Sequence, residues 1–116
     1  MARRVRIHPD FLADVTRQIA WLARNGETSW IGRLEADVSG TMELLDRYPA
    51  AGMLIERQGA IVLRQVIFRS TPYVAWYLYD DGPPTPDVLL VRLYHARQRR
   101  PRPDPSRWLR GSSEGP

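Results

Sequence analysis

Between residues 61 and 95 the chain reads IVLRQVIFRSTPYVAWYLYDDGPPTPDVLLVRLYH, which contains three apolar runs separated by turn-forming residues. The runs at 61–68, 73–79 and 88–95 are rich in β-branched and aromatic residues, a composition typical of strands. A short turn separates the first two runs, and residues 80–87, with one glycine and three prolines, form a loop. We therefore predict three consecutive strands. At least one should be central in its sheet, because its apolar character is almost continuous.

The residues before these strands favour a short strand and then two helices. Val5 and Ile7 alternate with arginines, which predicts a strand over residues 3–8. Residues 10–25 carry an apolar stripe at helical spacing, and a second such stripe runs from residue 28 or 29 to about residue 48. Because the connection around Gly26 is short, the two helices should lie antiparallel, as a hairpin. The stripes consist of Phe11, Leu12, Val15, Ile19, Leu22 and Ala23, and of Ile31, Leu34, Val38, Met42 and Leu45.

The predicted order is β-α-α-β-β-β, an α+β fold in which an antiparallel sheet packs against an N-terminal helical hairpin. Residues 1–98 should form one domain, since 116 residues leave little room for a second. Residues 99–116 are rich in proline and arginine. Because proline at alternate positions disfavours both helix and sheet, we expect an extended or disordered tail. Trp108 in this tail either docks on the domain or a partner, or is incidentally exposed.

The composition excludes several classes of function. Cysteine is absent, which excludes disulfides and thiolate chemistry, and the two histidines, His8 and His95, match no metal-binding spacing. We expect no metal, no other cofactor and no small-molecule substrate. No apolar run approaches the roughly 18 residues of a membrane span, so a cytoplasmic location is expected. All 17 basic residues are arginine, and the net charge of +4 favours polyanions or acidic protein segments as partners.

Four parts of the chain together resemble the ParE/RelE superfamily, the toxins of bacterial type II toxin–antitoxin systems. PDFLADV at 9–15 is similar to the start of the family's first long helix, and LLDRYPAAG at 44–52 to the exit from its second. VLR at 62–64 with PYVAWY at 72–77 is similar to its leucine-arginine and tyrosine-containing hairpin. VRLYHARQR at 91–99 is similar to the end of its last strand. The resemblance covers most of the chain.

This resemblance implies a toxin that a cognate antitoxin neutralises in a hetero-oligomer, and it leaves two activities open. ParE-type members bind and poison DNA gyrase without catalysing a reaction themselves, whereas RelE-type members cleave messenger RNA on the ribosome. The antitoxin should be acidic, since the toxin is basic, and should add a strand at a sheet edge or lay an amphipathic helix over an apolar groove. A repurposed family member that serves only as a scaffold is a third alternative.

RNA cleavage needs an acid, a base and cations around the phosphate. His95 is the candidate acid or base, because histidine titrates near neutral pH. Glu56, expected in the loop before the first hairpin strand, is a candidate base. Arg64, Arg92 and Arg97 are candidates to hold the phosphate.

These candidates also have structural interpretations. A histidine at a strand end, such as His95, often makes a hydrogen bond that fixes the following loop. Arg64 either pairs with Asp80 or Asp81 or contacts the antitoxin. The aromatic side chains of the middle strand either stack on RNA bases or belong to the core and its rim. They are Tyr73, Trp76, Tyr77 and Tyr79.

One departure from the family pattern favours the gyrase-binding branch. Ribosome-dependent members typically carry an arginine directly after the tyrosine that opens the middle hairpin strand, and here Val74 follows Tyr73. The second helix also carries Glu35, Asp37 and Glu43 in place of the basic surface of a ribosome binder. We therefore predict a gyrase poison, with a ribosome-dependent mRNA endonuclease as the alternative.

A toxin that works by binding needs an exposed recognition surface. One candidate is the edge of the hairpin with Trp21, Arg24, Trp30 and Arg33, and another is the stretch 97–102, because exposed tryptophan and arginine are favoured at interfaces. Alternatively, the tryptophans pack the hairpin and the arginines are only solvated. The full set of candidate target- or antitoxin-binding residues is Arg64, Tyr73, Trp76, Tyr77, Arg92, His95, Arg97, Arg99, Trp21, Trp30 and Arg33.

Overall fold

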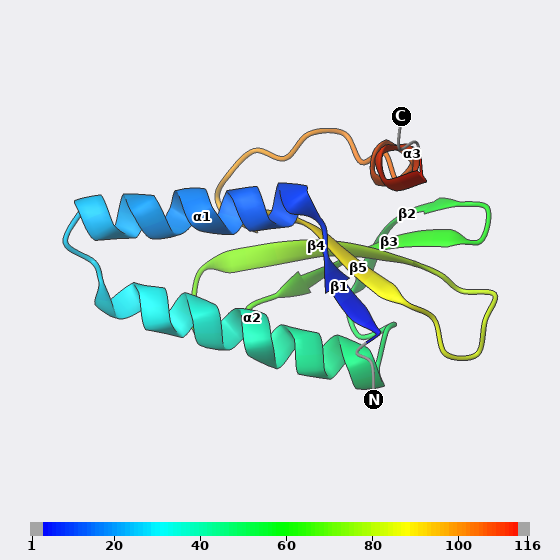
Figure 1. Cartoon of the computed structure of the whole chain (residues 1–116), viewed down its shortest axis with the longest axis horizontal. Coiled ribbons are helices and arrows are strands. Elements are labelled where there is room, and N and C mark those ends of the chain that lie inside the picture. Colours follow the sequence, from blue (N-terminus) through cyan, green and yellow to red (C-terminus); the bar gives the residue numbers. More distant parts are fainter. Residues whose placement is uncertain (1–3, 114–116) are drawn as a thin grey trace.

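The structure is a computed structural model that describes residues 4–113 and the side chains of residues 4–109. Two long helices precede a run of strands, and a short helix ends the described chain, so the predicted α+β class is confirmed. Among these residues, no helix is both long and apolar enough to cross a membrane. Figure 1 shows the elements, which in chain order are β1 (Val5–Ile7), α1 (Pro9–Arg24), α2 (Ser29–Arg47), β2 (Met53–Gln58), β3 (Ile61–Ile67), β4 (Tyr73–Asp80), β5 (Val88–His95) and α3 (Ser106–Ser113).

The strands form one five-stranded sheet in the order β1-β5-β4-β3-β2. Strands β2 to β5 are consecutive antiparallel neighbours, as predicted for β3, β4 and β5, but β1 pairs with β5 in parallel. The prediction of an antiparallel sheet is therefore wrong for its first strand, and the sheet is mixed. The helical hairpin carries the chain from β1 at one edge of the sheet to β2 at the other edge. Strand β1 therefore meets β5 only through tertiary packing.

Strand β2 is absent from the sequence prediction, which placed Glu56 in a loop. It pairs antiparallel with β3 from Met53 to Gln58, with a bulge between Leu54 and Glu56. All of its residues except Ile55 are exposed. An edge strand that buries only one side chain does not show the regular alternation that marks a strand in sequence. The hairpin to β3 turns at Gly59, which has a φ of 63°.

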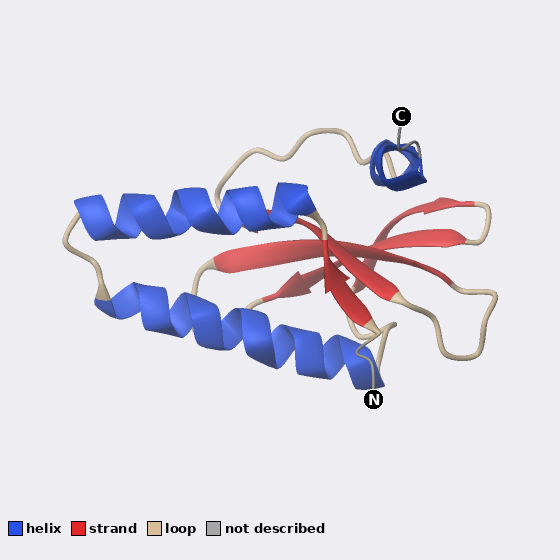
Figure 2. Cartoon of the chain, viewed as in Figure 1, coloured by secondary structure: helices blue, strands red, loops and turns tan. Residues whose placement is uncertain are grey.

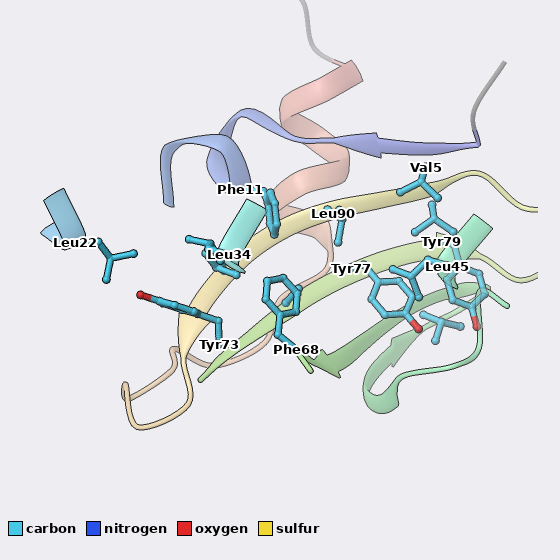
Figure 3. Packing of buried hydrophobic residues seen from close by; sticks show 14 residues of the cluster. Val5, Phe11, Leu22, Leu34, Leu45, Phe68, Tyr73, Tyr77, Tyr79 and Leu90 are labelled. Carbon is cyan, nitrogen blue, oxygen red and sulfur yellow. The ribbon is translucent and has the colours of Figure 1, made fainter. Parts of the chain in front are cut away.

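The two faces of the sheet are covered by different parts of the chain. Strand β4 points Tyr73, Ala75, Tyr77 and Tyr79 toward α1 and α2, where they join the main core, and its intervening residues point to the opposite face. Figure 2 shows the two long helices running side by side, with α3 set apart from them. Figure 3 shows Leu22, Leu34 and Tyr73 at one end of the main core, and Leu45 with Tyr77 and Tyr79 at the other.

The opposite face of the sheet is closed by the C-terminal segment. The expectation of an extended or disordered tail is wrong for residues 106–113, which form α3. Trp108 is only 2% exposed and packs in a second cluster with Trp76 and Tyr94. Its indole Nε1 also donates a hydrogen bond to Asp10 Oδ2 at 3.1 Å. The alternate prolines end at residue 105, and Asp104 then accepts from the Ser106 amide at 3.2 Å, as an N-terminal helix cap does.

Helix α2 is fastened to the turn between β3 and β4 by a buried carboxylate. Asp37 accepts hydrogen bonds from the Ser70 amide at 3.1 Å and from Thr71 Oγ1 at 2.7 Å. From the sequence, Asp37 was expected to lie with Glu35 and Glu43 on the acidic surface of this helix. Only the two glutamates are exposed, whereas Asp37 is buried and holds the turn in place. This fixes the start of β4, where the candidate site lies.

Candidate functional site

A pocket of about 640 Å³ opens at the end of the molecule that carries the turn between α1 and α2, on the left in Figure 1. Its walls come from the last turns of α1, the start of α2, the start of β4 and the end of β5. Gly26, with a φ of 71°, makes the tight turn that brings the two helices to this point. The lining residues are Arg17, Gln18, Ala20, Trp21, Leu22, Arg24, Glu27, Trp30, Pro72, Tyr73 and His95.

Two tryptophans form the helical side of this pocket, as the hairpin-surface hypothesis requires. Trp21 is 48% exposed, whereas Trp30 is partly buried against the main core. The guanidinium carbon of Arg33 lies 4.7 Å from the centre of the Trp30 ring, a cation–π contact that holds the indole in place. The alternative that the tryptophans only pack the hairpin thus applies in part to Trp30 and not to Trp21.

Tyr73 and His95 form the sheet side of the pocket. They are paired across β4 and β5, and their rings meet edge to face with centroids 5.5 Å apart. The Tyr73 hydroxyl donates to Gln18 Oε1 at 3.0 Å. Burial, with a smaller contribution from the charge of Glu27, raises the pKa of Tyr73. The phenol therefore stays neutral at physiological pH and serves as a fixed aromatic wall.

His95 makes the structural hydrogen bonds that sequence analysis gave as its alternative role. Its Nδ1 accepts from the Arg97 amide at 3.1 Å, and its own amide donates to Gln98 Oε1 at 3.2 Å. Both bonds fix the loop that follows β5. Within residues 4–109 no carboxylate forms an ion pair with His95. The imidazole is thus oriented by backbone and lacks the carboxylate partner that orients many catalytic histidines.

Arg64 lies away from this pocket and is engaged inside the fold. Its Nε donates to the Tyr79 hydroxyl at 2.9 Å, and its Nη1 donates to the Gly52 carbonyl at 2.8 Å. The predicted pairing with Asp80 or Asp81 is therefore wrong. On β4 the partner of Arg64 is Tyr77, four residues from the Tyr73–His95 pair, which corresponds to about 13 Å along the strand.

Arg92 is also engaged internally, with a residue that sequence analysis missed. Asp14 on α1 is 3% exposed, and its Oδ2 accepts from Arg92 Nε at 2.6 Å and from the Leu93 amide at 2.9 Å. Burial alone would lower the pKa of the Arg92 guanidinium, but the hydrogen bonds and charge of Asp14 outweigh it and leave that pKa raised. Arg17 also contacts the Asp14 carboxylate. Arg92 therefore fastens α1 to β5.

Two more predicted contact residues, Trp76 and Tyr77, lie in the protein core. Trp76 donates from Nε1 to Gln65 Oε1 at 3.0 Å on the face covered by α3. The Tyr77 hydroxyl donates to the Pro49 carbonyl at 2.6 Å and accepts from the Gly52 amide at 2.9 Å, and burial raises its pKa to about 12. A Cβ on Gly52 would lie 2.5 Å from the Gln65 carbonyl oxygen, so this close approach requires glycine.

The structure thus gathers one part of the predicted set and disperses the rest. Trp21, Trp30, Tyr73 and His95 meet at the pocket, whose lining also includes the exposed Arg17 and Arg24 of α1. Of the nuclease candidates, only His95 and Arg97 lie together, at the end of β5. Glu56 is exposed on the edge strand β2, where its pairing partner on β3 is Leu63. Arg64 makes the hydrogen bonds to Tyr79 and Gly52 described above. Arg97 and Arg99 are exposed after the end of β5.

The pocket residue Gln18 and the buried Asp14 could have been suspected from their spacing. Phe11, Asp14, Gln18 and Leu22 recur every three or four residues and so share one face of α1 with core side chains. A polar residue at such a position must find a partner inside the fold. The sequence did not show which partner, because Leu93 and Tyr73 reach that face only through the tertiary structure.

Comparison with models of known protein families gives no match to this chain, and a search of curated proteins gives none. In the part of the chain that the structure describes, no group of three or more His, Cys, Asp or Glu side chains is placed to hold a metal ion.

Proposed function

We propose that the chain is the toxin of a bacterial type II toxin–antitoxin pair, with a RelE/ParE-like fold, that acts in the cytoplasm by binding DNA gyrase. The resemblance of its four sequence segments supports this proposal, and the α+β architecture with a helical hairpin over the sheet is compatible with it. The protein would have no catalytic group of its own, and its activity would consist of occupying a surface of the target.

One observation carries the choice of binding over RNA cleavage. Trp21 is exposed at the pocket with Arg24 beside it on the lining, a composition typical of a protein-binding hot spot. Among the side chains proposed for RNA cleavage, His95 and Arg97 lie together at the end of β5, but Arg64 and Arg92 use their guanidinium groups inside the fold. RNA cleavage would require acid, base and cation around a single phosphate.

The edge strand β2 supports the presence of a cognate antitoxin. It is the last strand of the sheet, so its outer edge is free to pair among the described residues. Met53 is 61% exposed and Leu54 is 47% exposed at the start of this strand, whereas the bulge and the charged Glu56 and Arg57 protect only its second half. An acidic antitoxin segment that adds a strand here would cover both side chains and balance the basic charge of the chain.

Induced expression of the chain alone in a bacterium tests this proposal. We expect growth arrest that co-expression of the cognate antitoxin relieves, with plasmid DNA losing negative supercoils while messenger RNA stays intact. Rapid mRNA cleavage with unchanged supercoiling would replace the proposal with the RelE-type activity. Unimpaired growth would contradict a toxin role and favour the scaffold alternative.

A further inference from the structure

We infer that the pocket between α1, α2 and the Tyr73–His95 pair takes a large apolar side chain from an acidic segment of the toxin's protein target. This inference rests on the proposed function and specifies how the target would be bound. Its basis is an apolar pocket of defined volume with the exposed Arg24 on its wall and two further exposed arginines attached to wall residues.

The volume and lining of the pocket fit a side-chain anchor. The pocket volume of about 640 Å³ lies within the range of roughly 300–1,000 Å³ that ligand-binding pockets span. The pocket is therefore large enough to hold an aromatic side chain. The walls are mainly aromatic and aliphatic. Leu22, in the last turn of α1, is buried, whereas Trp21 is 48% exposed. Burying the face of Trp21 against a second apolar group would remove apolar surface from water, which favours association.

The charge around the pocket indicates which residues should lie beside the apolar side chain in the bound segment. Arg24 lies on the pocket wall, Arg33 packs on the ring of the wall residue Trp30, and Arg97 donates its amide to the wall residue His95; all three arginines are exposed. Within residues 4–109 none of the three forms an ion pair. Glu27 is the one acidic residue of the lining.

Arginine forks recognise carboxylates in a bidentate manner, so unpaired ones around an apolar pocket favour a partner with acidic residues beside its anchor. A basic or uncharged segment would leave Arg24, Arg33 and Arg97 without a carboxylate partner on binding.

The opposite end of α2 supplies matched control positions. Arg24 and Arg47 each lie in the last turn of a helix and are exposed, so reversing either charge has the same effect on net charge and a similar effect on the helix. Tyr48, which is 63% exposed, is the corresponding control for Trp21. From the start to the end of α2 the distance is about 27 Å, because each helical residue advances about 1.5 Å.

The test measures equilibrium binding of the purified full chain to purified DNA gyrase, with the fold of each variant checked by circular dichroism. We expect Trp21→Ala and Arg24→Glu each to weaken binding by about tenfold or more, the loss typical of hot-spot residues. Tyr48→Ala and Arg47→Glu should change it by less than about twofold. Raising the salt concentration should weaken wild-type binding more than binding of Arg24→Glu.

The outcomes separate this inference from the proposed function. If the wild-type chain binds gyrase and the pocket variants bind equally well, the pocket inference is wrong while the gyrase proposal stands. If the wild-type chain does not bind gyrase, the proposed function is wrong, and so is the inference that a segment of gyrase occupies the pocket. Two further results would overturn the inference: a self-associated wild-type chain that Trp21→Ala makes monomeric, or single-stranded RNA binding that Trp21→Ala abolishes.

Discussion

The carboxylate of Asp14 lies 2.6 Å from Nε of Arg92 and joins the first helix to the last strand at the edge of the sheet. Strand β1 pairs only with residues 88–90 of β5, so among the described residues no strand lies beside the following part of that edge of β5. Asp14 accepts the Leu93 amide there at 2.9 Å and so takes the place of a strand partner. One carboxylate thus satisfies both a backbone donor and a largely buried guanidinium.

We predict that Asp14→Asn lowers the free energy of unfolding by about 3 kcal/mol, because it leaves the Arg92 charge buried without its counter-ion. Urea denaturation measures this change. Asp46→Asn is the control, since Asp46 pairs with Arg4 at 3.9 Å on the surface and its loss should cost about 0.5 kcal/mol or less. Equal effects of the two substitutions would show that the Asp14–Arg92 pair does not hold α1 to the sheet.

Trp108 should contribute to stability although it lies beyond the main domain predicted from sequence. We expect Trp108→Ala to lower the free energy of unfolding by about 3–5 kcal/mol, the usual cost of removing a large buried aromatic side chain. The exposed Arg102→Ala in the same segment should change it by about 0.5 kcal/mol or less. The same denaturation experiment measures both variants, and a Trp108→Ala chain as stable as the control would mean that α3 does not cover the sheet.

Tyr77 should make stability depend on pH in the alkaline range. Its pKa is raised from 10.0 to about 12 by burial, so above pH 10 the folded chain keeps a phenol proton that the unfolded chain loses. The stabilisation is fully present below pH 10 and falls by about 1.4 kcal/mol per pH unit as the pH rises toward 12. Tyr73 and Tyr94, whose pKa values are also raised, add to this slope.

Tyr77→Phe should therefore make the pH dependence shallower between about pH 10 and 12, as measured by urea denaturation at each pH. At pH 7 the variant should lose about 1–3 kcal/mol, because the Pro49 carbonyl and the Gly52 amide lose their partner. Val62→Ala is the control, since it removes buried apolar volume without removing a titratable group. An unchanged slope in Tyr77→Phe would contradict the assignment.

Most of the fold could be predicted from sequence because its elements have strong local signals. The apolar stripes of α1 and α2 and the runs of β3, β4 and β5 are set by side chains adjacent on one helix face or strand. The exposed edge strand β2 has no such signal. The parallel pairing of β1 and the docking of Trp108 depend on residues far away in the chain, about which a local pattern says nothing.

The candidate site was predictable only in part, for the same reason. Trp21 and Trp30 were proposed as interface residues because exposed tryptophan is favoured at interfaces, and the structure brings both to one pocket. The engagement of Arg92 with Asp14 joins positions 78 apart in the sequence, and the two acceptors of Arg64 are a tyrosine hydroxyl and a backbone carbonyl. Sequence spacing does not reveal such partners. Arg64 and Arg92 were therefore predicted to bind a phosphate or a protein partner, whereas both are engaged within the fold.

The most direct test of the proposed function is a supercoiling reaction with purified DNA gyrase, titrated with the wild-type chain and with Glu56→Gln. Inhibition should rise with occupancy of the enzyme. Glu56→Gln should inhibit about as well as the wild type, because Glu56 lies on β2 outside the pocket and no proton transfer by it is involved. A parallel ribosome translation reaction should leave its mRNA intact. Intact supercoiling together with mRNA cleavage that Glu56→Gln abolishes would contradict the account and make the protein a nuclease.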